Sequence, residues 1–213
     1  MTISIQYGTS KHAKYAEAIC SLIEEAARLR GTGIAKRDPN YIRTKFENGN
    51  AVIALDGDKL VGFCYIEIWE NKKYVANSGL IVHPDYRSLG LAKEIKTKAF
   101  ELSKKKYPES KLFGITTSLP VMRINSELGY KPVTFSELTQ DETFWNGCKS
   151  CPNYDILTRN DRKNCLCTGM LYDPNRPNTK SQSEKDANIK KFYRWVQIKT
   201  VSFLKFLKPL KIF

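Results

Sequence analysis

The residues with the clearest chemical potential form the pattern R-x-x-G-x-A, from Arg87 to Ala92, soon after an apolar, β-branched run that ends before Pro84. This order predicts a strand, a turn and then the start of a helix. The first turn of a helix has backbone N–H groups without partners and carries the positive end of the helix dipole. Gly90 would let the backbone approach a ligand closely, so we expect this helix start to bind an anion such as a phosphate.

The elements that must position this segment follow from the apolar periodicity, which predicts the order βααβββαβα. Asp38 and Pro39 are typical of a helix start, and Asp56-Gly57-Asp58 is typical of a hairpin turn. The expected strands cover residues 3–7, 51–55, 60–69, 74–82 and 112–116, and the expected helices cover residues 13–29, 38–46, 89–107 and 119–128. A strand meander that feeds a strand-helix-strand unit predicts an α/β protein with a mixed sheet and helices on both faces.

The stretch LIVHPDYRSLGLA, from Leu80 to Ala92, resembles the acyl-CoA-binding segment of the GNAT superfamily of N-acyltransferases. The matching positions are Val82, Pro84, Arg87, Gly90 and Ala92. A looser resemblance extends over residues 1–135. The resemblance implies a GNAT-like mixed, mostly antiparallel central sheet, in which the strands at 74–82 and 112–116 splay apart and hold the acyl donor between them.

The same resemblance implies which residues hold acetyl-CoA or succinyl-CoA. Backbone N–H groups from Arg87 to Lys93 would bind the pyrophosphate, and those of Ile81 and Val82 would polarise the thioester carbonyl. The Arg87 side chain either adds a charge-assisted contact or faces solvent. The expected cofactor-binding residues are Leu80, Ile81, Val82, Arg87, Ser88, Leu89, Gly90, Leu91, Ala92, Lys93 and Asn125.

Acyl transfer to an amine also needs an acid for the departing thiolate. In many family members a tyrosine of the helix at 119–128 has this role, but this chain has Asn125 at the matching position. An amide can donate a hydrogen bond but no proton. The remaining candidates are Ser126, Tyr130, His83, a water molecule and release of the thiolate without an acid.

A base for the proton of the amine is the second requirement. The strand at 74–82 has no carboxylate, so Glu67 and Glu70 on the preceding strand are the nearest candidates. Strand alternation places Glu67 on the same face as Tyr65 and Trp69. The alternative is an ordinary exposed strand glutamate. We therefore select Glu67, Ser126 and Tyr130 as the candidate catalytic residues.

Basic residues gather where the GNAT fold selects its acceptor, in and after the first helix. The candidate substrate-binding residues are Arg28, Arg30, Lys36, Arg37 and Arg123. Guanidinium groups bind carboxylates through paired hydrogen bonds, which favours a small acidic amine over a polyamine or an aminoglycoside. The alternative is a solvated basic loop. The stretches ARLRGTGIAKRDPNYI, CKSCPNYDIL and CLCTGMLYDP also resemble GNAT proteins of arginine biosynthesis in Bacteroidetes, which implies glutamate as the acceptor.

Two close cysteine pairs, Cys148-x-x-Cys151 and Cys165-x-Cys167, are typical of tetrahedral thiolate coordination and predict a structural zinc site. We expect the second pair to lie on a strand over residues 165–172, whose alternation points both sulfur atoms the same way. A reduced cluster without metal and a redox pair are the alternatives. Cys20 and Cys64 fit apolar periods and are expected in the core.

The net charge of +13 is unevenly distributed. Residues 180–213 contain nine basic side chains against Glu184 and Asp186, a local charge of +7, which leaves +6 for the rest. Such a remainder suits an enzyme with anionic substrates, and we do not expect a nucleic-acid partner for the folded domain. The basic, aromatic tail at 189–213 could pack on its own domain, contact another subunit, lie on an anionic membrane or bind nucleic acid.

Four segments follow from these patterns. They are an acyl-CoA-binding domain (1–138), a cysteine-rich excursion with the last strand of the sheet (139–172), a linker (173–188) and a helical tail (189–213). Hydrophobic residues make up 41% and charged residues 27%, as in ordinary globular proteins. There is no signal-like N-terminus and no apolar run of about 18 residues. We therefore expect a cytoplasmic protein with reduced cysteines.

These features favour an N-acyltransferase that moves an acetyl or succinyl group from CoA to the amine of a small acidic acceptor. A protein N-terminal or lysine acetyltransferase is the enzymatic alternative, and an open groove instead of a basic pocket would support it. A non-catalytic acyl-CoA sensor that binds nucleic acid or membrane through its C-terminal half is the other alternative, and the missing tyrosine favours it. A homo-oligomer is compatible with each.

Overall fold

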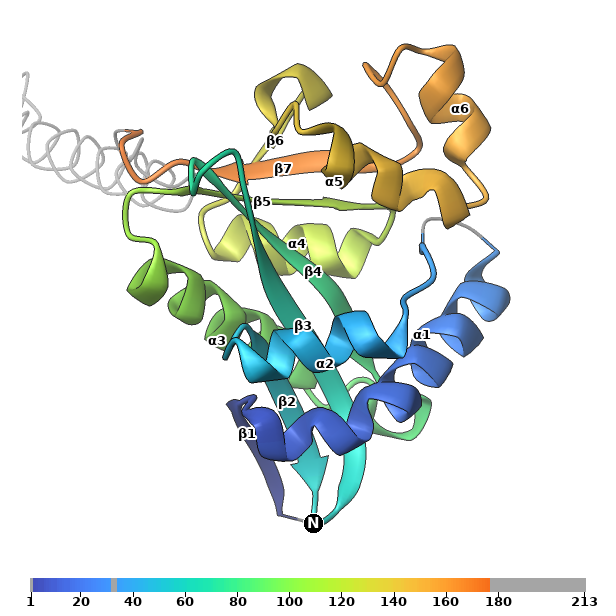
Figure 1. Ribbon diagram of the computed structural model, residues 1–213, viewed down its shortest axis with the longest axis vertical. Helices are drawn as coiled ribbons and strands as arrows, with labels where there is room; N and C mark the ends of the chain where they lie inside the picture. Colours follow the sequence, from blue (N-terminus) through green and yellow to red (C-terminus); the bar gives the residue numbers. More distant parts are fainter. Residues whose placement is uncertain (1, 32–33, 177–213) are drawn as a thin grey trace, which may run out of the picture. The chain divides into compact units, whose positions relative to one another are not determined.

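The computed structural model describes residues 2–31 and 34–176 (Figure 1). The chain divides into two compact units, Met1–Pro174 and Asn175–Phe213, and every element described below belongs to the first. The expected tail at 189–213 and most of the expected linker lie outside the described residues. Within the described part, no helix is both long enough and apolar enough to cross a membrane.

The elements predicted from periodicity are present, with shifted ends. The strands are β1 (Ile3–Tyr7), β2 (Ala51–Asp56), β3 (Lys59–Trp69), β4 (Tyr74–Val82), β5 (Lys111–Thr116), β6 (Lys131–Val133) and β7 (Thr168–Tyr172). The helices are α1 (Ala16–Arg30), α2 (Pro39–Glu47), α3 (Leu91–Lys106), α4 (Leu119–Glu127), α5 (Glu142–Asn146) and α6 (Tyr154–Arg159). Asp38 caps α2, because its side chain accepts hydrogen bonds from the backbone N–H groups of Asn40 and Tyr41.

The strands form one sheet with the order β1-β2-β3-β4-β5-β7-β6. Strands β4 and β5 are parallel, and every other neighbouring pair is antiparallel. The expected mixed, mostly antiparallel sheet is therefore confirmed. The chain leaves the sheet after β6 and returns as β7, which inserts between β5 and β6.

Helices cover both faces of the sheet, as expected (Figure 1). Alternate residues of β3 show the division: Phe63 and Tyr65 pack with α1 and α2, whereas Cys64 and Ile66 pack with α3. Helix α4 packs on the α3 face through the half-buried Met122. We call these two faces the α1/α2 face and the α3/α4 face.

Strands β4 and β5 pair over only three residues each, from Tyr74–Ala76 to Lys111–Phe113. Beyond these residues, β4 continues to Val82 and β5 continues to Thr116 without any pairing between them. The facing edges of the two strands therefore lack a strand partner, and the sheet is open at this place. This is the divergence that the family resemblance implied.

The excursion between β6 and β7 folds into α5, α6 and short 3-10 helices that pack around Trp145 and Leu157. The expected strand over residues 165–172 is wrong in its first part, because β7 begins only at Thr168. Cys165 and Cys167 therefore lie in the loop before β7, where strand alternation does not align their sulfur atoms.

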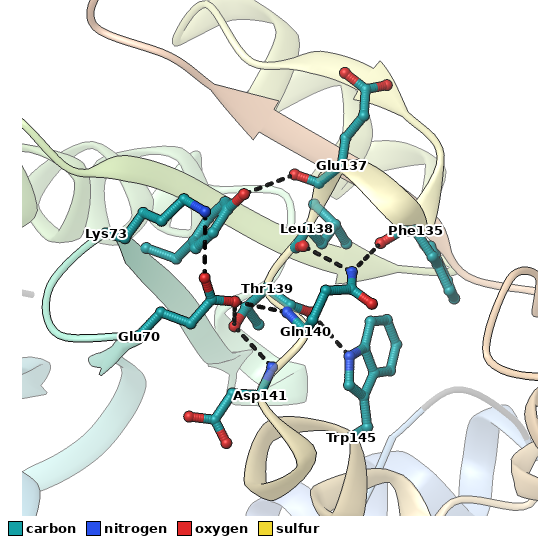
Figure 2. A network of polar contacts seen from close by, with 10 residues as sticks. Glu70, Lys73, Phe135, Glu137, Leu138, Thr139, Gln140, Asp141 and Trp145 are labelled. Atoms are coloured by element: carbon teal, nitrogen blue, oxygen red, sulfur yellow. Dashed lines mark hydrogen bonds and ion pairs between the residues drawn. The ribbon is translucent and has the colours of Figure 1, made fainter.

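Glu70 ties the excursion to the turn between β3 and β4 (Figure 2). One oxygen of its carboxylate accepts hydrogen bonds from Thr139 Oγ1 and from the backbone N–H of Gln140, each at 2.7 Å. The other oxygen lies 3.4 Å from Lys73 Nζ. Trp145 adds a bond from its ring nitrogen to the Thr139 carbonyl at 2.9 Å. Glu70 is thus engaged in holding the excursion and does not line the cavity described next.

Candidate active site

A cavity of 960 Å³ opens where β4 and β5 diverge. Its lining on the α1/α2 face comes from α1, α2 and the loop between them, with residues such as Ile23 and Tyr41. On the α3/α4 face it comes from α3 and α4, with Ala92 and Asn125. Because both faces contribute, two ligands can reach the same point from opposite sides of the sheet.

The start of α3 has the geometry of an anion-binding site. Gly90 is the N-cap residue with a φ angle of 82°, and Ser88 is also left-handed with a φ angle of 65°. Among the described residues, no hydrogen-bond acceptor is found for the backbone N–H groups from Ser88 to Ala92. Of the predicted segment, Arg87 and Ala92 line the cavity, and Ser88, Leu89, Gly90, Leu91 and Lys93 lie outside its lining. Consecutive free donors at the positive end of a helix can hold a phosphate.

Strand β4 has a bulge beside the cavity. Gly79 and Leu80 lie opposite the single residue Cys64 of β3. Gly79 has a φ angle of 66°, and a Cβ atom there would come within 2.6 Å of the Tyr65 ring, so only glycine fits. The predicted residues Leu80–Val82 all line the cavity. The β4 edge toward β5 is unpaired here, so its backbone groups are available to an extended ligand.

On the α1/α2 face, Arg37 and Glu67 line the cavity within a network of buried and half-buried polar side chains. Glu67 accepts a hydrogen bond from the Tyr41 hydroxyl, and its second oxygen lies 2.5 Å from Lys45 Nζ. Arg37 Nε donates to the Tyr65 hydroxyl at 2.8 Å. The predicted base is therefore in the cavity, with both of its oxygen atoms already bonded.

Burial keeps the two tyrosines of this network neutral, and the tyrosines together with Glu67 keep the guanidinium charged. It raises the pKa of Tyr41 and of Tyr65, and Glu67 adds to both effects. Burial alone would lower the pKa of Arg37, but Tyr65, Tyr41 and Glu67 together raise it. With Lys45, the network holds two cations against one carboxylate, so this wall of the cavity favours an anionic ligand.

The other predicted substrate-binding residues are divided between the cavity and the surface. Arg30 and Lys36 line the cavity. Arg30 donates to Thr117 Oγ1 at 3.0 Å, and Lys36 Nζ lies 3.0 Å from Glu24. Arg28 and Arg123 are exposed and do not line the cavity. The structure therefore gathers Arg30, Lys36 and Arg37 at one wall and leaves the other two outside it.

The end of α4 brings Asn125 to the cavity but not the two candidate acids. Asn125 is 1% exposed, and its Oδ1 atom is buried without a hydrogen-bond partner in the described part of the chain. Tyr130 is fully buried and donates to Asn77 Oδ1 at 3.1 Å. Ser126 is exposed. Neither Ser126 nor Tyr130 lines the cavity.

All four clustered cysteines line the cavity. Burial raises the pKa of Cys148 to about 11 and that of Cys167 to about 12, and the neighbouring thiols add to both shifts. Within residues 2–31 and 34–176, no three cysteine, histidine, aspartate or glutamate side chains are placed to hold a metal ion. The arrangement therefore does not fit the expected structural zinc site, and the four cysteines form part of the cavity wall.

Lys96 is a residue of the cavity that the sequence analysis missed. It is only 2% exposed, although lysine is almost never fully buried without a partner. A signal was present, because Ala92, Lys96 and Ala99 follow the spacing of one helix face. Ala92 lines the cavity and Ala99 is buried, so this spacing indicates a lysine that faces inward.

Comparisons with known proteins identify the fold. Residues 16–118 match the model of the acetyltransferase (GNAT) family. A comparison with curated protein sequences gave no match. Similar solved structures include N-acetylglutamate synthase from Neisseria gonorrhoeae complexed with coenzyme A and N-acetyl-glutamate, a GNAT family acetyltransferase from Staphylococcus aureus Mu50, and phosphinothricin acetyltransferase from Sinorhizobium meliloti in complex with AcCoA.

The three structures have sequence identities of 16%, 16% and 14% and TM-scores of 0.59, 0.58 and 0.55, in the same order. The alignments cover 83%, 81% and 81% of this chain. This chain spans 36% of the synthase, 99% of the staphylococcal protein and 89% of the phosphinothricin enzyme. At these identities the likeness shows a common fold.

Proposed function

We propose that this chain is an acyl-CoA-dependent N-acyltransferase of the GNAT family, whose acetyltransferase model matches residues 16–118. It moves an acetyl or succinyl group from CoA to the amine of a small, carboxylate-bearing acceptor. The supporting observation is the cavity that crosses the sheet, with free backbone N–H groups at the start of α3 on one face and the Arg37 cation on the other.

The acyl donor fits the α3/α4 face, and when bound it supplies the thioester. The N–H groups from Ser88 to Ala92 bind its pyrophosphate, and the Arg87 side chain adds a cation. The unpaired edge of Leu80–Val82 aligns the pantetheine as an added strand and donates to the thioester carbonyl. The unpartnered Oδ1 atom of Asn125 is a further polar contact for the donor.

Glu67 accepts the proton of the attacking amine. Because Lys45 and Tyr41 already occupy its two oxygen atoms, the route from the amine runs through the Tyr41 hydroxyl. The hydroxyl gives its proton to Glu67 while its oxygen takes one from the amine. Lys45 holds the carboxylate in place, and the half-buried phenol of Tyr41 remains neutral at both ends of the transfer.

The acceptor binds at the wall formed by Arg30, Lys36 and Arg37. Arg37 bonds to Tyr65 through Nε and to the Ala35 and Lys36 carbonyls through Nη1. Its Nη2 atom has no partner within the described residues and can donate to a carboxylate. Glutamate is the leading candidate, which is supported by the likeness to a synthase that was crystallised with N-acetyl-glutamate.

Thiol release from acetyl-CoA and from succinyl-CoA tests this function. The acceptor panel contains glutamate, other amino acids, spermidine and a short peptide. We expect turnover with an acidic amino acid and little with spermidine, because the acceptor wall is cationic. Preferred turnover of the peptide would indicate a protein acetyltransferase instead. CoA binding without acylation of any amine would overturn the enzymatic function and favour an acyl-CoA sensor.

A further inference from the structure

Lys96 is a buried amine on the α3/α4 face of the cavity whose presence packing does not explain. Among the described residues, its ammonium forms no hydrogen bond or ion pair, and its Nζ atom lies 5.2 Å from the centre of the Tyr130 ring. A buried charge without a counter-ion lowers the stability of a fold. An apolar side chain would stabilise the packing better, so an anion that Lys96 meets during turnover would explain its presence.

The ionisable groups beside Lys96 are Cys64 on β3 and Tyr130 after α4, and neither is an anion at neutral pH. Burial raises the pKa of Cys64 to about 11, although Lys96 acts in the opposite direction. Its thiol donates to the Ser78 carbonyl at 3.3 Å. Burial also raises the pKa of Tyr130 well above its ordinary value. The anion must therefore come from a ligand in the cavity.

The face of the sheet on which Lys96 lies indicates which ligand anion it would meet. Lys96, Asn125 and the free N–H groups at the start of α3 all lie on the α3/α4 face, whereas Arg37 and Glu67 lie on the α1/α2 face. The donor enters on the first face and the acceptor on the second. On the basis of the proposed function, we propose that Lys96 is the general acid that protonates the departing CoA thiolate, a proton that Asn125 cannot supply.

The step balances without a further reactant. The nitrogen of the acceptor forms a bond to the thioester carbonyl carbon, and the carbon–sulfur bond breaks with its electron pair going to sulfur. Sulfur takes a proton from Lys96 Nζ, which becomes a neutral amine. The surplus proton of the acceptor goes through Tyr41 to Glu67. When the products leave, Glu67 releases its proton to water and Lys96 regains a proton from water.

The acidity of Lys96 suits this role. Burial lowers its pKa to about 8, with Cys64 acting in the opposite direction. Lys96 is therefore mostly protonated at neutral pH, and it releases a proton more readily than an exposed lysine does. We expect kcat to fall as the pH rises through the pKa of Lys96, because only the ammonium form can protonate the sulfur. Cys64 and Tyr130 titrate at higher pH.

The test compares Lys96→Met and Lys96→Gln with Lys105→Met, an exposed lysine of the same helix that lies outside the cavity lining. Methionine has a similar length and removes the buried charge, so the fold is expected to persist, which thermal unfolding checks. Loss of a general acid predicts a fall in kcat of about 100-fold. It also predicts loss of the decline of kcat at high pH, and Lys105→Met should retain both properties.

A second measurement does not depend on turnover. The ultraviolet absorbance of the thiolate reports the ionisation of CoA bound to the full-length protein. In the wild type, the bound thiol should ionise at a lower pH than free CoA, because Lys96 stabilises the thiolate, and Lys96→Met should abolish this difference.

The possible outcomes separate the role of Lys96 from the acyltransferase function. Unchanged kcat in both Lys96 variants, or no shift in thiol ionisation, would overturn the role of Lys96 while the acyltransferase function stands. If CoA binds but no amine is acylated, the proposed function fails. A shift in thiol ionisation that depends on Lys96 would still place the lysine beside the sulfur. Failure of the wild type to bind CoA would overturn both.

Discussion

The nitrogen atoms of the Arg37 guanidinium have different partners, and under the proposed function this division would preorganise the residue for binding an acceptor. Nε and Nη1 bond to Tyr65 and to two backbone carbonyls, so the orientation of the side chain is set before a ligand arrives. Within residues 2–31 and 34–176, Nη2 is the guanidinium nitrogen without a partner, so it is available to an acceptor. A donor that is already fixed in place loses little conformational entropy on binding. Discrimination between acceptors would therefore depend strongly on this one residue.

Replacing Arg37 should weaken binding of carboxylate acceptors specifically. Arg37→Met removes a charge-assisted hydrogen bond, which is commonly worth about 1.5–3 kcal/mol and so predicts a rise in KM of roughly 10- to 100-fold. Initial rates of thiol release with the best carboxylate acceptor and with its amide analogue measure the effect. Arg43→Met is the control, because Arg43 pairs with Glu17 outside the cavity lining. An equal rise in KM for both acceptors would show that Arg37 does not recognise the carboxylate.

Sequence alone could locate a basic cluster here but not which of its members face the cavity. Arg28 and Arg30 lie in the same helix and look alike in a pattern, yet Arg30 lines the cavity and Arg28 does not. The place of Lys96 in the cavity was not predicted for a related reason. It lies among the other lysines of α3, which are typical of a solvated helix face. Because lysine side chains are usually exposed, the spacing that Lys96 shares with Ala92 did not indicate a buried lysine.

At the scale of elements, the turn between β3 and β4 supports a wall of the cavity. Glu70, Asn71 and Lys72 are consecutive residues with positive φ angles, a conformation that costs free energy in residues other than glycine. The bonds from Glu70 to Thr139 and Gln140 offset this cost and secure the start of the excursion. The cysteine-bearing wall is thus held by a carboxylate distant from it in the sequence.

Glu70→Gln should lower the free energy of unfolding at neutral pH by about 1 kcal/mol, because charge-assisted bonds become neutral ones. Burial tends to raise the pKa of Glu70, but the bonds from Thr139 and Gln140 and the charge of Lys73 lower it overall. A carboxyl group whose pKa is lower in the folded state stabilises the fold above its unfolded-state pKa, and this stabilisation disappears as the pH falls through the folded-state value.

The stability difference between wild type and Glu70→Gln should therefore shrink as the pH falls below about 4. Urea unfolding at a series of pH values measures it. Glu109→Gln, an exposed carboxylate after α3, serves as the control and should show no such trend. A constant difference between wild type and Glu70→Gln at all pH values would contradict the argument.

Periodicity predicted the core strands and helices well, because each has a clear apolar face. It failed in the excursion, where α5 and α6 are shorter than two helical turns and β7 starts later than Cys165 and Cys167. The Glu70 network could not be predicted either. Its partners are distant in the sequence, and no local pattern marks a hydrogen bond that forms only after the sheet has assembled.

For the whole molecule, the described residues that line the cavity all belong to the unit Met1–Pro174. They lie between Ile23 and Cys167. A chain that ends at Pro174 should therefore bind CoA within about twofold of the full-length protein, measured by calorimetry. Loss of CoA binding by a folded shortened chain would place part of the site in residues 175–213. The oligomeric state and binding to anionic vesicles, compared for the two forms, test the alternatives for the tail.

The divergence of β4 and β5 also has a kinetic consequence. Because the cavity is lined from both faces of the sheet, each substrate could bind without first releasing the other. Donor and acceptor should occupy the protein together, and initial-rate plots for the two substrates should give intersecting lines. Parallel lines, or exchange of labelled CoA into acetyl-CoA in the absence of an amine, would instead indicate a covalent acyl-enzyme intermediate.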